Sequence, residues 1–472
     1  MNETRREQIR SNAKYLREVR PIDPEEIHEY VEGQPHPAAI TQVLREDAYE
    51  LGLVERADGA FEPVAEEPVT GPFDGVEAFP ADYSMAIEEL LVAEYGAGWP
   101  DGESGDAIRE RVRDLKTDYL WGNDVEYDHE TALAYALYHL PDYYAAVQYV
   151  LSVLAADGLL GRKLRVLDVG AGVGGPALGL YDLLPEDALV EYTAVEPSSA
   201  VDVLTAMLDE TGRNFHATVH ETTAEAFEPT GAYDLVLFSN VLSELDDPAA
   251  VVERYAESVA DDGSLVGLAP ADRNTATNLR EVERDVENGL SVYAPTVRLW
   301  PGERPTDEGW SFDVAPDIEV PPFQRRLDEE ASDPDHEPGE FENVDVQYAY
   351  TILRPDGTQR IDFRPDVSRY AKMADMDDHV SNRIDVAAIK LSHDLTDDDD
   401  ANPLFKIGDG SEGVAHYAVL TRGTALNDAL ETAAYGDLLL VENVLALWND
   451  DEGAYNLVVD DETVVDRVPA GG

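Results

Sequence analysis

The residues best suited to bind a cofactor form a short run of glycines behind an acidic side chain. In Val166-Leu-Asp-Val-Gly-Ala-Gly-Val-Gly-Gly175, an apolar stretch and Asp168 lead into Gly170, Gly172 and Gly174. A chain that turns sharply from a strand into a helix beside a ligand needs positions that lack a Cβ atom. We therefore predict that these glycines cradle an adenosyl-type cofactor. Asp168 is expected to hold the loop or to reach the cofactor's amino group.

Two other interpretations of this loop stay open at this point. Gly170, Gly172 and Gly175 also satisfy the spacing G-x-G-x-x-G, which is typical of dinucleotide-binding folds. A glycine-rich turn between a strand and a helix can also occur without any ligand. Under the favoured adenosyl-cofactor interpretation, Ala171 lies inside the loop and is a further cofactor contact.

Two more polar residues follow apolar runs. Glu196 comes directly after a predicted strand at residues 191–195, where an acidic side chain can accept hydrogen bonds from both ribose hydroxyls. Asn240 ends an apolar strand predicted over residues 233–240. We predict that Asn240 contacts the cofactor and faces its methyl end together with Asp168, which makes Asn240 the candidate catalytic residue.

The elements that must position these residues alternate between strand and helix. Strands are predicted at the run before Gly170 and at residues 191–195, 215–220, 233–240 and 264–269, with helices at 177–184, 200–210 and 249–259. This βαβ spacing indicates an α/β fold with a doubly wound parallel sheet of the Rossmann-like type. Ligands bind such sheets at the carboxyl ends of the strands, where all the candidate residues fall. The pattern favours an S-adenosylmethionine (SAM) methyltransferase domain over residues 158–340.

Helical segments are expected to precede this domain. Residues 1–70 read as helix, helix and hairpin, the order of a winged-helix unit that binds nucleic acid or protein, with one helix predicted over residues 36–51. Residues 83–157 are predicted to be helical and are rich in tyrosine. Aromatic residues at helical spacing usually pack in a core, and the alternative is that some of them line a substrate entrance. Residues 291–340 form a Pro-rich insertion that we expect to be irregular.

The last part of the chain is predicted to be all-β. A strand extension covers residues 341–375, and residues 380–468 are predicted to be an OB-fold-like barrel of three strands, a helix at 424–434 and two strands, the last at 454–465. An OB barrel that grips single-stranded RNA needs aromatic and basic side chains on one face. The candidates are Phe405, Lys406, Tyr417, Arg422 and Trp448. A structural or protein-binding barrel is the alternative.

The charge of the chain indicates the solvent in which it works. Acidic residues outnumber Lys and Arg by 99 to 34, for a net charge of −65, and only six residues are lysine. Because the acids are dispersed and not gathered in a tail, we expect a cytoplasm of very high salt. At molar salt the Debye length is about 3 Å, so the acidic charge does not exclude an RNA partner. No apolar run is long enough to span a membrane, so no membrane association is expected.

Missing residue types exclude several kinds of site. The chain has no cysteine, which excludes disulfides, thiolate zinc sites and cysteine-ligated iron–sulfur clusters. The ten histidines show no metal-ligand spacing, so no metal site is predicted.

Four sequence stretches together resemble one family. They are the run Leu140-Pro-Asp-Tyr-Tyr-Ala-Ala-Val-Gln-Tyr-Val-Leu, the glycine loop, the run Ser-Asn-Val-Leu-Ser-Glu-Leu from Ser239, and Gly309-Trp-Ser-Phe. The chain resembles the mitochondrial small-ribosomal-subunit methyltransferase-like assembly factors and their prokaryotic relatives over roughly residues 85–365. Members of that family usually carry an iron–sulfur cluster on cysteines of the insertion. Here Ser311 stands where a cysteine is usual, so the resemblance implies that the cluster is absent or replaced by apolar packing.

The resemblance implies a SAM-binding protein that acts on small-subunit ribosomal RNA or assembles with it. The favoured hypothesis is a SAM-dependent methyltransferase. The first alternative is a non-catalytic assembly factor that keeps SAM as a structural ligand. The second alternative, an NAD-linked oxidoreductase, is disfavoured because no acid/base or substrate-domain motif follows the loop.

Overall fold

The computed structural model describes residues 1–123, 125–287, 289–300, 302–303, 310–334, 336–396 and 401–468. The chain divides into two compact units. The first unit comprises residues 1–237 and 316–346, and the second comprises residues 238–315 and 347–472.

The core of the first unit is a parallel sheet. Its strands, in spatial order, are β5 (Phe215–His220), β4 (Leu189–Val195), β3 (Lys163–Val169) and β6 (Tyr233–Ser239), of which β6 ends at the boundary with the second unit. The connecting helices are α8 (Gly175–Leu183) and α9 (Ala200–Leu208). The four strands are parallel, as an alternating order of strands and helices requires. The predicted Rossmann-like α/β arrangement is therefore confirmed.

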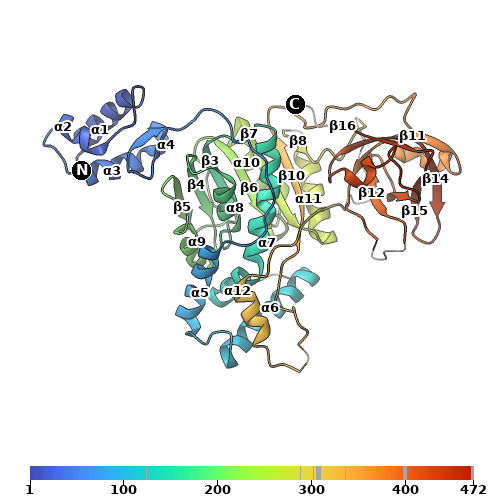
Figure 1. The fold of residues 1–472 in the computed structure, drawn as a ribbon, viewed down its shortest axis with the longest axis horizontal. Helices are drawn as coiled ribbons and strands as arrows, with labels where there is room; N and C mark the ends of the chain where they lie inside the picture. Colours follow the sequence, from blue (N-terminus) through green and yellow to red (C-terminus); the bar gives the residue numbers. More distant parts are fainter. Residues whose placement is uncertain are drawn as a thin grey trace. The chain divides into compact units, whose positions relative to one another are not determined.

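A long helix packs directly against the helix that follows the glycine loop. This helix is α7 (His129–Ala156), beside α8 in Figure 1. A Cβ atom on Gly179 would lie 2.1 Å from Cγ1 of Val147, so only glycine permits this close approach. The remaining helices of this region are α5 (Ala81–Tyr95), α6 (Gly102–Trp121) and α12 (Pro322–Glu329).

The N-terminal part forms its own small core. Its elements are α1 (Glu3–Leu16), α2 (Pro24–Tyr30), α3 (Pro37–Glu46), α4 (Ala48–Leu51), β1 (Leu53–Glu55) and β2 (Phe61–Pro63). The single helix predicted over residues 36–51 is wrong, because the chain leaves the helix at Asp47. The carboxylate of Asp47 there accepts hydrogen bonds from Arg6 and Arg10 of α1.

The second unit begins with antiparallel strands and two helices. Its first elements are η1 (Leu242–Glu244), α10 (Pro248–Ala256), β7 (Val259–Pro270), α11 (Arg273–Val286), β8 (Ser291–Ala294), β9 (Asp313–Ala315), β10 (Val346–Arg354) and η2 (Met373–His379). β10 pairs antiparallel with β7 and β8 and also pairs with β9. The insertion at residues 291–340 is therefore not wholly irregular as predicted, because it supplies β8, β9 and α12.

The second unit ends in a closed barrel. Its elements are β11 (Arg383–Lys390), β12 (Leu404–Gly408), β13 (His416–Leu420), α13 (Ala429–Thr432), β14 (Leu438–Asn449), β15 (Ala454–Val459) and β16 (Val464–Val468). The order β11-β12-β13-β15-β14 closes through pairing of β14 with β11, and β16 adds to β14. The predicted five-stranded barrel is confirmed. The predicted last strand at 454–465 is two strands, because the chain turns between Asp460 and Thr463, and the predicted helix at 424–434 is shortened to α13.

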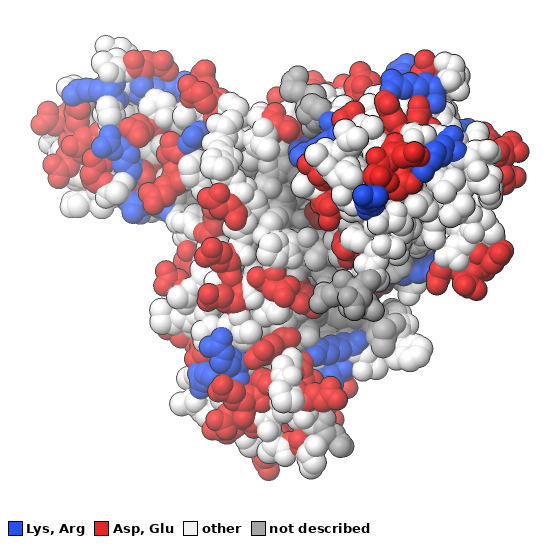
Figure 2. Space-filling view, turned by 45° about the vertical axis from the view of Figure 1, so that its right-hand side comes forward, with Lys and Arg blue, Asp and Glu red and all other residues white. Residues whose placement is uncertain are grey.

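Acidic side chains are more widespread than basic ones on the face shown in Figure 2. Figure 2 shows Asp and Glu spread over the visible face, with Lys and Arg in small groups among them. Within the described ranges, no helix is long and apolar enough to cross a membrane, and no three His, Asp or Glu side chains are arranged to hold a metal ion.

Candidate functional site

The glycine loop lies at the carboxyl end of β3 and is tied to the end of β4. The backbone N–H groups of Gly170 and Ala171 donate to the carbonyl oxygen of Val195 at 2.8 and 3.1 Å. Gly172 has φ +52°, and apart from its two chain neighbours no atom of the described residues lies within 4 Å of where its Cβ would be. The loop therefore leaves open space at Gly172, where backbone can approach a ligand.

The next glycine is required by packing as well as by its dihedral angle. Gly174 has φ +98°, and a Cβ there would lie 3.2 Å from Leu204 Cδ1 in α9. Residues with a Cβ rarely adopt this backbone conformation. The sequence prediction that this position must be glycine agrees with this geometry.

Glu196 joins the loop to the end of β4. It is 6% exposed, and its Oε2 accepts from Gly172 N at 2.8 Å. Its Oε1 accepts from Ser198 N at 2.9 Å and from Ser198 Oγ at 2.5 Å. A carboxylate offers about four acceptor positions. One remains at Oε2, next to the loop, for a further donor such as a ribose hydroxyl.

Asp168 is fully buried beneath the loop. Its Oδ2 accepts from the hydroxyl of Tyr192 at 2.6 Å, whereas Oδ1 has no hydrogen-bond partner among the described residues. Burial raises the pKa of Asp168 to about 7; the Tyr192 hydrogen bond lowers it and the nearby Glu196 charge raises it. A buried polar atom without a partner is costly. A donor such as a ligand's ammonium group would satisfy Oδ1.

An aromatic cluster adjoins the loop in the first unit. Its rings, with centroids 5.1–6.4 Å apart, are Tyr119, Tyr127, Tyr135, His139 and Tyr143. Tyr143 Cβ lies 3.3 Å from the Cβ position of Gly175, and the carbonyl of Tyr127 accepts from Ser199 N at 3.3 Å. Of the tyrosines noted in the sequence, Tyr144 packs inward and donates to Asp182. The core interpretation of the tyrosine-rich stretch therefore holds for Tyr144, and a substrate entrance lined by other tyrosines stays a prediction.

Asn240 belongs to the second unit. It follows β6, has φ +59°, and donates its backbone N–H to Leu268 O of β7 at 3.0 Å. Asparagine tolerates this left-handed conformation better than most residues. The structure thus groups Asp168 and Glu196 with the loop at the ends of β3 and β4, and it holds Asn240 through β7.

The predicted RNA-binding residues of the barrel do not form one face. Phe405 is only 3% exposed and packs in the barrel core, where no base could stack on it, so its assignment needs correction. Lys406 pairs across the ladder with Tyr417, and its Nζ donates to Trp310 O at 2.6 Å. Arg422 lies 3.2 Å from a carboxylate oxygen of Asp461.

Trp448 lies on the other face of the barrel wall. Tyr417 lies opposite Asn456, which lies opposite Leu447. Successive strand residues point to opposite faces, so Trp448, the next residue after Leu447, faces away from Tyr417. Its indole is 40% exposed and donates to Asp450.

Several residues that support the loop and α7 were not predicted from the sequence. Ser198 follows Glu196 by two positions, a spacing typical of local hydroxyl turns, and could have been noticed. Tyr192 lies on a strand, as many core tyrosines do, and no sequence pattern marks it as the partner of Asp168. Gln324 and Asn343 donate to carbonyls of α7 that lie 187 and 205 residues away in the sequence, and only tertiary structure brings such residues together.

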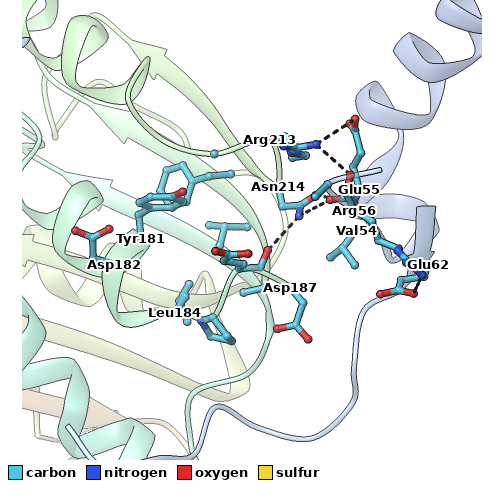
Figure 3. Close-up of a pocket in the computed structure, with 17 residues that line it drawn as sticks. Val54, Glu55, Arg56, Glu62, Tyr181, Asp182, Leu184, Asp187, Arg213 and Asn214 are labelled. Carbon is cyan, nitrogen blue, oxygen red and sulfur yellow. Dashed lines mark hydrogen bonds and ion pairs between the residues drawn. The ribbon is translucent and has the colours of Figure 1, made fainter. Parts of the chain in front are cut away.

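A polar pocket lies away from the glycine loop, at the amino ends of β4 and β5 (Figure 3). In Figure 3, Asn214 and Arg213 point toward the hairpin of the N-terminal part. Asn214 Oδ1 accepts from Glu55 N at 2.8 Å, Asn214 Nδ2 donates to Glu55 O at 3.2 Å, and Arg213 donates to Arg56 O. These bonds dock the N-terminal hairpin on the sheet at the end opposite the loop.

Comparisons with known families divide the chain into three stretches. A model described as a methyltransferase domain matches residues 142–319. The N-terminal and C-terminal models of a domain of unknown function, DUF8157, match residues 6–57 and 374–468. Along the chain, the stretch similar to the methyltransferase model therefore lies between the two stretches that match the DUF8157 models. A search of curated proteins finds no match.

Solved structures with similarity to the chain include three methyltransferases. Magnesium protoporphyrin IX methyltransferase from Synechocystis with bound SAM has 19% identity over 40% of this chain and 88% of its own, with a TM-score of 0.26. The plantazolicin methyltransferase BpumL with S-adenosylhomocysteine (SAH) has 12% identity over 58% and 99%, with a TM-score of 0.29. N-methyltransferase NodS from Bradyrhizobium japonicum has 14% identity over 40% and 85%, with a TM-score of 0.25.

Proposed function

We propose that this protein binds SAM and transfers its methyl group. The observation that carries the proposal is the arrangement of three features at the ends of β3 and β4. Gly172 borders open space, Glu196 keeps an acceptor position beside it, and Asp168 Oδ1 is buried without a partner among the described residues. The methyltransferase model over residues 142–319 covers all three.

Each residue then has a defined role. Gly170, Gly172 and Gly174 would lie against the methionine part, Glu196 would accept from the ribose, and Asp168 would accept from the amino group. When bound, SAM supplies a methyl group already activated on a sulfonium. The chain's own residues then need to provide orientation and a dry pocket. Asn240 is proposed to face the methyl end.

The proposed substrate is RNA of the small ribosomal subunit, in a cytoplasm of high salt. The closed barrel is of the OB type that binds single strands in other proteins. The resemblance to ribosomal assembly factors supports the same class. The net charge of −65 would repel RNA in dilute buffer but is screened at molar salt.

A non-catalytic assembly factor is the second candidate. Three acceptor positions of Glu196 are already used by Gly172 and Ser198, so the chain itself fixes the conformation of the loop. A loop organised in this way would suit SAM as a structural ligand as well as a methyl donor.

Titration calorimetry with SAM, SAH and NAD in 2 M KCl tests the cofactor. We expect SAM and SAH to bind and NAD not to bind. Glu196→Ala should weaken SAM binding by about 1–3 kcal/mol, the cost of losing a hydrogen bond to a charged group. Ser198→Ala is the matched control, because it removes one bond to Glu196 and keeps the carboxylate. Equal SAM affinity in Glu196→Ala and wild type would refute the ribose assignment.

Methyl transfer is tested separately. Purified protein, labelled SAM and immature small subunits should yield labelled RNA if the protein is an enzyme. Stable binding to the particle without label in RNA would favour the assembly factor. Gly172→Asp should abolish SAM binding in either case, because its side chain would project into the open space at the loop.

A further inference from the structure

Trp310 is an exposed aromatic residue with a fixed orientation. Its side chain is 37% exposed, yet its indole N–H donates to Ala271 O at 3.0 Å. Its own carbonyl accepts from Lys406 Nζ at 2.6 Å. The next residue, Ser311, is 3% exposed, and its Oγ lies 3.0 Å from the hydroxyl of Tyr435. The indole N–H and the backbone carbonyl of Trp310 are therefore both hydrogen-bonded within the second unit.

These anchors place Trp310 near the end of the strand that also holds Asn240. Ala271 directly follows β7, and Leu268, which accepts the backbone N–H of Asn240, lies three residues before it. Three extended residues span about 10 Å. Trp310 and Asn240 are thus bound to the same short stretch at the carboxyl end of β7.

The barrel stabilises the segment that carries Trp310. In the earlier part of the insertion, Trp300 Nε1 donates to the buried Asp409 at 2.6 Å, and Leu299 N donates to Asp409 O at 2.8 Å. Phe312 lies 5.7 Å from the Trp310 ring and 6.0 Å from the ring of His393. A side chain whose polar edge is satisfied and whose backbone is fixed loses little conformational freedom when a ligand covers it.

We propose that Trp310 stacks on a base of the RNA substrate at the carboxyl end of β7, and that the barrel contributes by holding Trp310 in place. This proposal rests on the proposed function, because it names the substrate contact of the same methyltransferase. A planar base fits a planar indole face, and stacking persists at molar salt where charge pairing is screened. The contact lies outside the barrel face predicted from the sequence, of which Phe405 is buried.

The test measures binding of a fluorescent 12-nucleotide single-stranded RNA and of an abasic strand of the same length by the full chain in 2 M KCl. Trp310→Ala and Trp310→Leu should weaken RNA binding about 5- to 150-fold, the loss expected for one base–aromatic stack. Trp310→Phe should restore most of the affinity. Wild type should bind the abasic strand as weakly as Trp310→Ala binds RNA. Trp121→Ala is the matched control, since Trp121 is 75% exposed on α6.

The outcomes separate this proposal from the proposed function. SAM affinity should be equal in wild type and all Trp310 variants, because Trp310 is not among the proposed SAM contacts. Unchanged RNA binding in both Trp310→Ala and Trp310→Leu, or no RNA binding by wild type, would overturn the stacking proposal even if SAM binds. Absence of SAM binding with a normal Trp310 effect on RNA would instead overturn the methyl-transfer proposal.

Discussion

At the scale of single residues, Asp168 combines a buried charge with an unsatisfied oxygen. Its Oδ2 is held by Tyr192, its Oδ1 has no partner in the described structure, and burial raises its pKa to about 7. An unfolded aspartate has a pKa of about 3.9. The folded state therefore binds more protons than the unfolded state between these values, and its stability decreases as the pH rises from about 4 to about 7.

This linkage predicts opposite effects of Asp168→Asn on stability and on binding. The amide keeps an acceptor for the Tyr192 hydroxyl and carries no charge. The melting temperature at pH 8 should therefore rise, by about 1–2 °C for each kcal/mol gained in a chain of this size. The difference from wild type should vanish near pH 4. SAM affinity, measured by calorimetry at pH 8, should fall because the carboxylate is lost, and wild-type affinity should increase from pH 6 to pH 8. A melting difference that is the same at pH 4 and pH 8 would contradict the assignment.

At the scale of elements, α7 contains a proline, and side chains from distant parts of the sequence replace the backbone hydrogen bond that the proline removes. Pro141 lies inside α7 and has no N–H, so Leu137 O loses its partner four residues on. Gln324 Nε2 replaces it, donating to Leu137 O at 2.9 Å and to Tyr138 O at 3.1 Å. Asn343 Nδ2 also donates to Tyr138 O at 3.1 Å. This repair holds the part of α7 that packs on the glycine-loop helix.

A double-mutant cycle tests the repair. Gln324→Leu should lower the free energy of unfolding by about 1–3 kcal/mol, because buried carbonyls lose their donor. Pro141→Ala supplies a backbone N–H for Leu137 O, so Gln324→Leu should cost less in that background, with a coupling of about 0.5–3 kcal/mol. Urea unfolding of the four proteins gives these values. Gln42→Leu, on the surface of α3, is the control and should change stability by less than about 0.5 kcal/mol. Additive effects of the two substitutions would show that Gln324 does not compensate for the proline.

At the scale of the whole molecule, charge is the dominant property. A net charge of −65 destabilises any compact state through self-repulsion. Many of the basic side chains form ion pairs with a nearby carboxylate, such as Arg113 with Glu340 and Arg383 with Asp460. Such pairs relieve the repulsion only locally.

The unfolding midpoint should therefore rise with salt. Between 0.15 and 1 M salt the Debye length falls from about 8 Å to about 3 Å, so thermal scans in KCl should show a steep increase followed by a plateau. A sucrose series at matched osmolality is the control, because sucrose stabilises by exclusion from the surface and not by screening. A midpoint that falls with KCl, or rises equally in sucrose, would contradict an origin in charge repulsion.

The local features could be predicted from the sequence. Period and spacing located β3 to β6, and the need for Cβ-free positions identified the glycine loop at the end of β3. The order of strands in residues 380–468 indicated a closed barrel. These inferences succeeded because backbone geometry and hydrophobic periodicity act over a few residues.

Contacts between distant side chains, in contrast, depend on the tertiary structure. It placed Phe405 inside the barrel, turned Trp448 away from Tyr417, and gave Asp168 its tyrosine partner. It also collected the five segments predicted from composition into two compact units. The physical reason is that strand register and long-range packing set the direction and burial of each side chain. Contacts such as Gln324 with Leu137 join residues whose separation carries no pattern in the sequence.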